Sequence, residues 1–214
     1  MSKKVIKKTK KKKVDTYHHG DLCNALVKEA LVILKEKGTQ GFTFRELSKR
    51  AGVSTTAHYR HFPTKEDLFA KIAIDGFDIL RGYLESAIEL YPLDPKKQLN
   101  QANQNYFQMV SKYPQHIYIM FGDTIAELKE KKTEVQDAGN ATYQTLLRLI
   151  RNCQIADVLN PKQDSNNLAI QVLSIIHGFS ALSMQGIFKN FDTSQSSIES
   201  FISDMTINQI KGLK

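Results

Sequence analysis

The sequence predicts an all-α protein of about nine helices, in which an N-terminal helix-turn-helix unit precedes a larger helical domain. Three observations support this fold class. Nearly every segment of the 214 residues places apolar side chains at helical spacing, and none alternates over a sustained stretch as a strand does. The hydrophobic content of 41% and the charged content of 24% are ordinary for a globular protein. Glycine, proline and capping residues recur at intervals that separate helices.

Caps, glycines and prolines set the boundaries of the expected helices. Gly38 ends the first helix, Gly52 supplies the positive φ that a tight turn needs, and Pro63 stops the third helix. Ser54 is placed to cap the third helix with its hydroxyl. The expected helices span residues 21–37, 43–50, 55–62, 64–90, 95–112, 115–130, 138–159, 165–189 and 196–211.

Three of these helices begin with a capping box. In this motif a hydroxyl residue and an acidic residue three positions later each accept a hydrogen bond from the other's backbone N–H. The pair satisfies donors that the first helical turn leaves unpaired, so it fixes where the helix begins. The boxes are Thr43-x-x-Glu46, Thr64-x-x-Asp67 and Ser196-x-x-Glu199.

The formal net charge of +8 is unevenly distributed along the chain. Residues 1–13 contain eight lysines and no acidic residue, and residues 14–65 carry eight Lys or Arg against five Asp or Glu. Residues 66–214 carry fourteen against seventeen. This asymmetry indicates a polyanion as the partner of the front of the chain. We expect residues 1–16 to form a disordered lysine-rich arm that adds non-specific, salt-dependent phosphate attraction.

Other features indicate a cytoplasmic protein. The lysine-rich arm lacks the apolar core of a secretory signal, and no lipidation motif adjoins it. Cys23 and Cys153 are far apart, and each lies in an apolar helical pattern. We therefore expect both cysteines to be reduced packing residues, and we expect no membrane partner.

The segment from Phe42 to Lys65 has the pattern of two short helices joined by a tight turn. In such a pair the second helix fits the major groove of double-stranded DNA, where each base pair shows its own donors and acceptors. Hydroxyl and imidazole side chains at the start of that helix, Thr55, Thr56 and His58, are expected to read bases. The candidate DNA-binding residues are Thr43, Arg45, Thr55, Thr56, His58, Tyr59, His61 and Lys65.

The same segment resembles the DNA-binding domain of TetR-family transcriptional regulators. The resemblance rests on a Gly-Val-Ser turn, on two short runs after it and on a Tyr-His-His-Gly motif that marks one subgroup. These are Gly52-Val53-Ser54, Tyr59-Arg60-His61-Phe62, Lys65-Glu66-Asp67-Leu68 and Tyr17-His18-His19-Gly20. Further on, His177-Gly178 is similar to the end of a Trp-His-Gly signature of a ligand-binding domain, with Ile176 at the tryptophan position.

The resemblance implies a division of the chain and a function. Residues 17–65 would form the helix-turn-helix domain, and residues 66–214 a helical domain that binds an effector and dimerises. The implied protein is a ligand-responsive repressor that binds a palindromic operator as a homodimer and responds to an unidentified small molecule. A transcriptional activator with the same contacts is the first alternative.

Residues 165–188 carry no charge, which is typical of a helix buried on all sides. We expect one side to face its own domain and the other a second subunit, together with the apolar stripe of the last helix. The predicted interface residues are Leu173, Ile176, Ser180, Met184, Phe201, Ile202 and Met205. Aromatic residues and a histidine of the middle helices form the predicted ligand pocket: Tyr106, Phe107, Tyr118, Phe121, Tyr143 and His177.

Other classes of function have weaker support. A non-specific polyanion-binding or membrane-surface protein would depend on the lysine-rich arm alone. An enzyme would need a nucleophile with a base, a metal cluster or a phosphate loop, and the sequence shows none of them. Neither the histidines nor the cysteines stand at metal-ligand spacing, so we expect no metal and no cofactor.

Overall fold

The computed structural model describes residues 19–188, 197, 200, 201 and 203–205, and these residues contain helices and no strand. The described helices are α1 His19–Lys37, α2 Phe44–Arg50, the 3₁₀-helix η1 Ala57–Arg60, α3 Lys65–Leu90, α4 Pro95–Lys112, α5 Pro114–Phe121, α6 Ile125–Lys131, α7 Thr133–Ile155 and α8 Ser165–Met184. The predicted all-α class is confirmed. The chain divides into two compact units, Met1–His61 and Phe62–Lys214.

In the first unit, α1 packs against α2 around a small apolar core. Leu26, Ile33 and Leu47 are fully buried there. An ion network also joins the two helices, because the guanidinium of Arg50 binds both oxygens of Glu36, at 3.1 and 2.5 Å, and also Glu46 at 2.8 Å. These bonds hold the pKa of the Glu36 carboxyl below its ordinary value.

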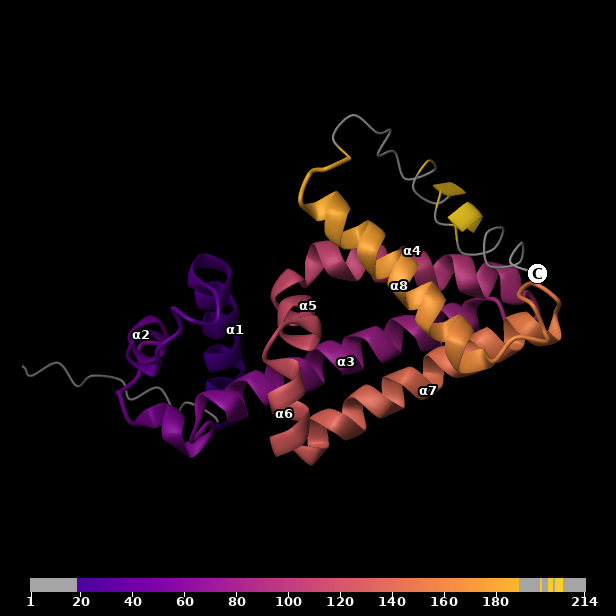
Figure 1. The fold of residues 1–214 in the computed structure, drawn as a ribbon. Coiled ribbons are helices and arrows are strands. Elements are labelled where there is room, and N and C mark those ends of the chain that lie inside the picture. The colour runs from indigo at the N-terminus through magenta and orange to yellow at the C-terminus, as the bar shows by residue number, and fades with distance from the viewer. Residues whose placement is uncertain (1–18, 189–196, 198–199, 202, 206–214) are drawn as a thin grey trace, which may run out of the picture. The chain divides into compact units, whose positions relative to one another are not determined.

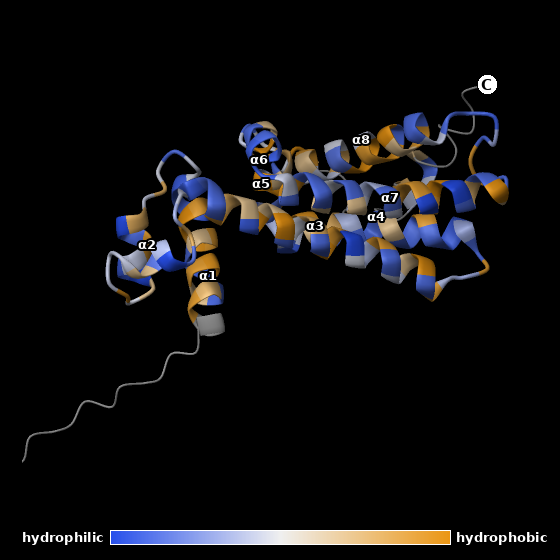
Figure 2. Ribbon diagram, turned by 90° about the horizontal axis from the view of Figure 1, so that it is seen from below, coloured by the Kyte–Doolittle hydropathy of each residue, from blue (hydrophilic) through white to orange (hydrophobic). Residues whose placement is uncertain are grey.

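The second unit is a bundle in which α3, α4, α7 and α8 are the long helices (Figure 1). α3 packs along α7 and α4 and also contacts α5 and α6, and α8 packs on α4 and α7. Apolar and polar residues alternate along these helices, as expected where one side of each helix is buried (Figure 2). By length and composition alone α8 could cross a membrane, which is weak evidence for a single helix; in the bundle it contacts α4 and α7.

The start of α3 agrees with the sequence pattern. The Asp67 carboxylate accepts a hydrogen bond from the Thr64 backbone N–H at 2.8 Å, and the Thr64 hydroxyl accepts one from the Asp67 N–H at 3.2 Å. The predicted capping box is therefore confirmed. Lys132, which precedes α7, donates to the other oxygen of Asp67 and so ties the start of α3 to the start of α7.

Other helix boundaries differ from the prediction. The expected helix 115–130 is two helices, α5 and α6, because the backbone is extended at Gly122, where a Cβ would lie 2.3 Å from the Tyr118 carbonyl oxygen. α7 begins at Thr133 and ends at Ile155, earlier than the expected 138–159. α8 ends at Met184. The expected helix 196–211 and its Ser196 cap lie largely outside the described residues.

α3 and α5 approach each other closely at Gly76. A Cβ built there would lie 2.4 Å from the sulfur of Met120 and 3.2 Å from Cβ of His116, both on α5. Met120 is fully buried and has little room to move. At Gly82, in the same helix, a Cβ would meet nothing within 4 Å.

We predict opposite effects for one substitution at these two glycines. Gly82→Ala should raise the free energy of unfolding by about 0.5–1 kcal/mol, because alanine restricts the unfolded chain and favours helix. Gly76→Ala gains the same helix preference but must displace Met120, so it should be less stable than Gly82→Ala by ~1–3 kcal/mol. Urea denaturation of both variants measures the difference. Equal stabilities would show that the α3–α5 contact does not depend on Gly76.

Candidate nucleic-acid interface and ligand cavity

A shallow basic concavity lies on the first unit, where α2 meets the turn that follows it. It is lined by Lys37, Thr43, Arg45, Glu46, Lys49, Arg50, Val53 and Thr55. Thr43 caps α2 by accepting a hydrogen bond from the Glu46 N–H at 3.3 Å. The Glu46 carboxylate does not complete the predicted box, because it binds Lys37 at 2.6 Å and Arg50 at 2.8 Å.

The cations around this concavity fall into two groups. Lys37 and Arg50 are paired with carboxylates of α1 and α2. Arg45 and Lys49 are exposed and make no ion pair among the described residues. They stand one helical turn apart on α2, so they present two uncompensated charges side by side. Lys49 is not among the residues predicted to bind DNA, although its i+4 spacing from Arg45 was a signal.

The turn after α2 is built as predicted, but the segment after it is not. Gly52 has φ +67°, and the Val53 N–H donates to the Ser48 carbonyl at 3.0 Å. The expected helix 55–62 is only the single 3₁₀ turn η1. The Ser54 hydroxyl does not cap it and lies 3.3 Å from the Thr56 hydroxyl instead.

The exposed side chains around η1 are those of Ser54, Thr55, Thr56, Tyr59 and Arg60. Tyr59 is 55% exposed. Thr55 also lines the basic concavity, so its hydroxyl shares that surface with Arg45 and Lys49 of α2.

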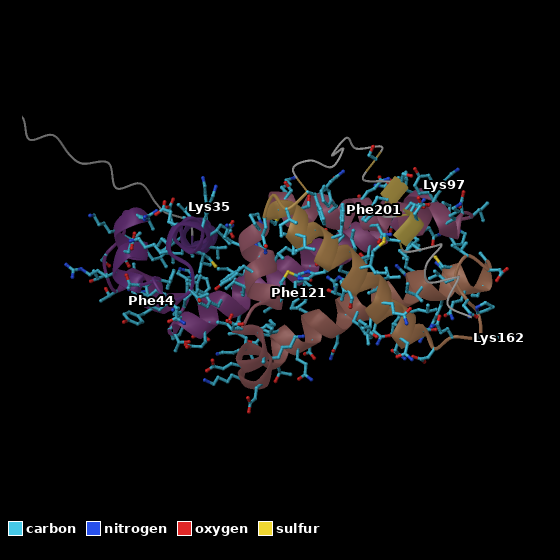
Figure 3. All side chains as sticks on the ribbon, turned by 45° about the horizontal axis from the view of Figure 1, so that its top comes forward. Lys35, Phe44, Lys97, Phe121, Lys162 and Phe201 are labelled. Carbon is cyan, nitrogen blue, oxygen red and sulfur yellow. The ribbon has the colours of Figure 1, made fainter. Side chains whose placement is uncertain are left out.

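The prediction that His58 reads bases is wrong. Its side chain is 1% exposed and points inward. Its ring stacks on Phe44 with centroids 4.1 Å apart, and its Nδ1 hydrogen-bonds the Ser48 hydroxyl at 3.0 Å (Figure 3 labels Phe44). His58 therefore joins η1 to α2, and Tyr59 packs against its ring at 4.1 Å.

The two remaining candidate DNA-binding residues, His61 and Lys65, follow η1 in the sequence. His61, which follows η1, is half-buried. Lys65 is the first residue of α3 and belongs to the second unit, where its ammonium nitrogen lies 5.3 Å from the ring centroid of Phe69. Phosphate contacts by His61 and Lys65 stay predictions.

The second unit encloses a cavity of about 240 Å³ between α3, α4, α7 and α8. Three of the predicted pocket residues line it, Tyr106, Phe121 and Tyr143. Figure 3 shows Phe121 at the end of α5. The apolar part of the wall consists mainly of Phe77, Leu80, Leu84, Leu99, Ala102, Leu146, Leu149, Val172, Leu173 and Ile176.

The other three predicted pocket residues do not line this cavity. Phe107 packs instead against Phe179, with ring centroids 5.8 Å apart. Tyr118 and His177 line a separate shallow depression beside α5 and α8. His177 nevertheless contacts a residue that lines the cavity, because its Nδ1 forms a hydrogen bond with the Tyr106 hydroxyl at 2.7 Å.

The structure also changes the predicted dimer face of α8. Leu173 and Ile176 face the cavity, and Ser180 is fully buried, so these three point inward. Met184 is 50% exposed. Ile170 and Leu182 are also exposed on α8.

Of the last predicted helix, Phe201 and Met205 are described and half-buried. Phe201 packs against Phe179, with ring centroids 4.9 Å apart (Figure 3). Ile202 lies outside the described residues.

The comparisons with known proteins agree with this geometry. Residues 26–72 match the family model described as bacterial regulatory proteins, tetR family. The chain therefore carries a TetR-family N-terminal domain. A search of curated proteins gave no match. The Tyr-His-His-Gly subgroup stays a prediction.

Solved structures resemble the whole chain. A Rhodococcus protein of unknown function is 24% identical with a TM-score of 0.76, covering 92% of this chain and 99% of that one. The TetR-family regulator PfmR of Thermus thermophilus is 20% identical, TM-score 0.67, over 88% and 98%. The fatty acid degradation regulator FadR of Bacillus halodurans is 15% identical, TM-score 0.67, over 95% and 99%. The fold is that of TetR-family transcriptional regulators.

We predict that His58 makes the stability of the protein depend on pH. Burial lowers the pKa of its imidazole, so the folded state keeps it neutral while the unfolded chain binds a proton below pH ~6.5. The free energy of unfolding should therefore fall as the pH drops from about 7.5 to about 5.5. His58→Phe keeps a ring against Phe44 and cannot titrate, so its stability should fall less over this range. Urea denaturation at both pH values measures the two slopes, and equal slopes would contradict the assignment.

Proposed function

We propose that the protein is a sequence-specific DNA-binding transcriptional regulator, which acts as a ligand-responsive repressor on a palindromic operator. The observation that carries the proposal is the surface formed by α2 and by the turn between α2 and η1. There the exposed Thr55 adjoins the cations Arg45 and Lys49, which make no ion pair among the described residues, and the exposed Thr56 follows Thr55 in the chain. Hydroxyls suit base edges and cations suit phosphates, and a DNA reader needs both.

The roles of the residues follow from what each can donate. Thr55 and Thr56 can donate or accept a hydrogen bond at a base edge, and their methyl groups can contact thymine. Arg45 and Lys49 neutralise phosphates. Tyr59 is held by the His58 ring and offers its hydroxyl to the DNA backbone. The buried His58 keeps η1 in place on α2, which is a positioning role and not a base contact.

A dimer is the form that suits a two-fold symmetric operator, because each subunit then contributes one reading surface. Exposed apolar side chains of α8 support this proposal, since Ile170, Leu182 and Met184 are 55, 41 and 50% exposed. Exposed apolar side chains that recur along one helix are a feature of interfaces between subunits.

The cavity in the second unit supports ligand control. A ligand that binds one arrangement of the dimer better than another shifts the population toward it and changes the affinity for DNA. In a repressor the ligand favours the arrangement that releases the operator. A cytoplasmic location follows from this function.

The test is selection of genomic DNA fragments by the purified protein at moderate salt. We expect enrichment of a two-fold symmetric site, with a preference over random DNA that persists when residues 1–13 are removed. Removing this arm should lower mainly the salt-sensitive part of the affinity. Enrichment of no common site would contradict the proposal and favour a non-specific polyanion binder.

Matched variants separate the two kinds of contact on the selected site. Thr56→Ala should alter the base preference, because it removes a hydroxyl from the reading turn. Lys49→Ala should weaken all sites alike and reduce the slope of log affinity against log salt by about one. Lys28→Ala, an exposed lysine of α1 outside the concavity, is the control and should change neither.

A charge at Leu182, one of the exposed apolar residues of α8, should dissociate the proposed dimer. Leu182→Glu would bury a carboxylate at the subunit interface, which is costly when no cation pairs with it. Analytical ultracentrifugation should show a dimer for the wild type and monomers for the variant at the same concentration. Ile155→Glu is the control, because Ile155 is 86% exposed at the end of α7. A wild-type monomer, or an unchanged Leu182→Glu dimer, would contradict this interface.

A further inference from the structure

Among the described residues, the wall of the cavity contains one charged side chain, that of Lys129 on α6. The remaining lining residues are apolar, aromatic or uncharged polar, and no Asp or Glu is among them. A ligand in this cavity therefore meets the positive charge of Lys129 and no negatively charged side chain of the described lining.

Lys129 contacts another residue of the cavity wall, Phe77. Its ammonium nitrogen lies 5.5 Å from the ring centroid of Phe77, which is itself part of the wall. The neighbouring position is Gly139, where a Cβ would lie 3.5 Å from both the Lys129 stem and the Phe77 ring. Gly139, Phe77 and the end of the Lys129 side chain are therefore neighbours in the cavity wall.

Apart from its contact with the Phe77 ring, the ammonium of Lys129 is not paired with a carboxylate in the described part of the protein. Lys131 pairs with Glu127 at 2.5 Å, and Lys132 pairs with Asp67. Lys129, between these two pairs in the chain, has no ion pair among the described residues. It is therefore free to pair with an anion from outside.

Three hydroxyl groups of the cavity wall already have partners in the protein. The Thr142 hydroxyl donates to the Phe77 carbonyl at 2.9 Å, and the Tyr106 hydroxyl bonds His177 at 2.7 Å. The Tyr143 hydroxyl donates to Asn166 at 3.3 Å. With these groups engaged, the interior favours an apolar body.

We propose that the ligand of this cavity is an aliphatic monocarboxylate, whose carboxylate pairs with Lys129 and whose apolar chain fills the space between α3, α4, α7 and α8. The proposal rests on the proposed ligand control and adds to it the chemical class of the ligand. An apolar molecule without an anionic head would fill the same space but leave Lys129 unpaired.

The test compares straight-chain carboxylates with the primary alcohols of equal length, from six to fourteen carbons, by calorimetry on the full-length protein without DNA. We expect at least one carboxylate to bind, and to bind about tenfold more tightly than its matching alcohol. Equal affinity of carboxylate and alcohol, or binding of neither series, would overturn the proposal. This comparison needs no variant and so does not depend on how a substitution folds.

Two variants locate the binding. Lys129→Gln should abolish the preference for the carboxylate and leave the affinity for the alcohol unchanged, whereas the matched Lys131→Gln should keep the preference. Leu146→Trp, which fills part of the cavity from α7, should weaken both series. A carboxylate preference that persists in Lys129→Gln, or binding that Leu146→Trp leaves intact, would place the ligand elsewhere and overturn the proposal.

Failure of this proposal and failure of the proposed function are distinguishable. If no carboxylate binds but a symmetric operator is selected, the regulator stands and the ligand class is wrong. If a carboxylate binds through Lys129 but no operator is selected, the ligand site stands and the proposed function is wrong.

Discussion

The arrangement of the second unit depends on the hydrogen bonds and the ion pair that the Asp67 carboxylate makes. It accepts from the backbone and hydroxyl of Thr64, which starts α3, and from Lys132, which starts α7. The ion pair with Lys132, together with the bonds from Thr64, lowers the pKa of this carboxyl, so it stays charged at neutral pH. α3 in turn contacts α4, α5, α6 and α7, so a single residue sets the starting point of the helix against which most of the bundle packs.

The same interaction would give the proposed ligand control a physical route. Lys129 and Lys132 stand three residues apart at the end of α6, the first at the cavity and the second bound to Asp67. An anion that pairs with Lys129 would act on a segment already tied to the start of α3, the first helix after the first unit in the chain. Such a ligand shifts the protein between two arrangements only by the difference between its affinities for them.

Helix caps and turns could be predicted from the sequence, but the direction in which a side chain or a helix face points could not. The Thr64–Asp67 cap and the positive φ of Gly52 depend on residues adjacent in the chain, so the pattern was sufficient for both. His58 looks the same in the sequence whether it faces a groove or Phe44, because histidine suits either place. For α8 the helix was evident but its rotation was not, because no charged residue marks the solvent side; Ile176 and Ser180 were consequently assigned to the wrong face.

Net charge identified the basic front of the chain, but only the ion pairs show which charges are available. Lys37 and Arg50 contribute to the sum of residues 14–65 and yet are engaged by Glu36 and Glu46, where they hold α1 against α2. Arg45 and Lys49 remain, on the side of α2 that adjoins the hydroxyls of η1. The same criterion separates Lys129 from Lys131 and Lys132 in a unit whose overall charge is negative. A cation that the fold leaves unpaired beside a concave surface is the one that can be neutralised by a ligand, whether the ligand is a phosphate or a carboxylate.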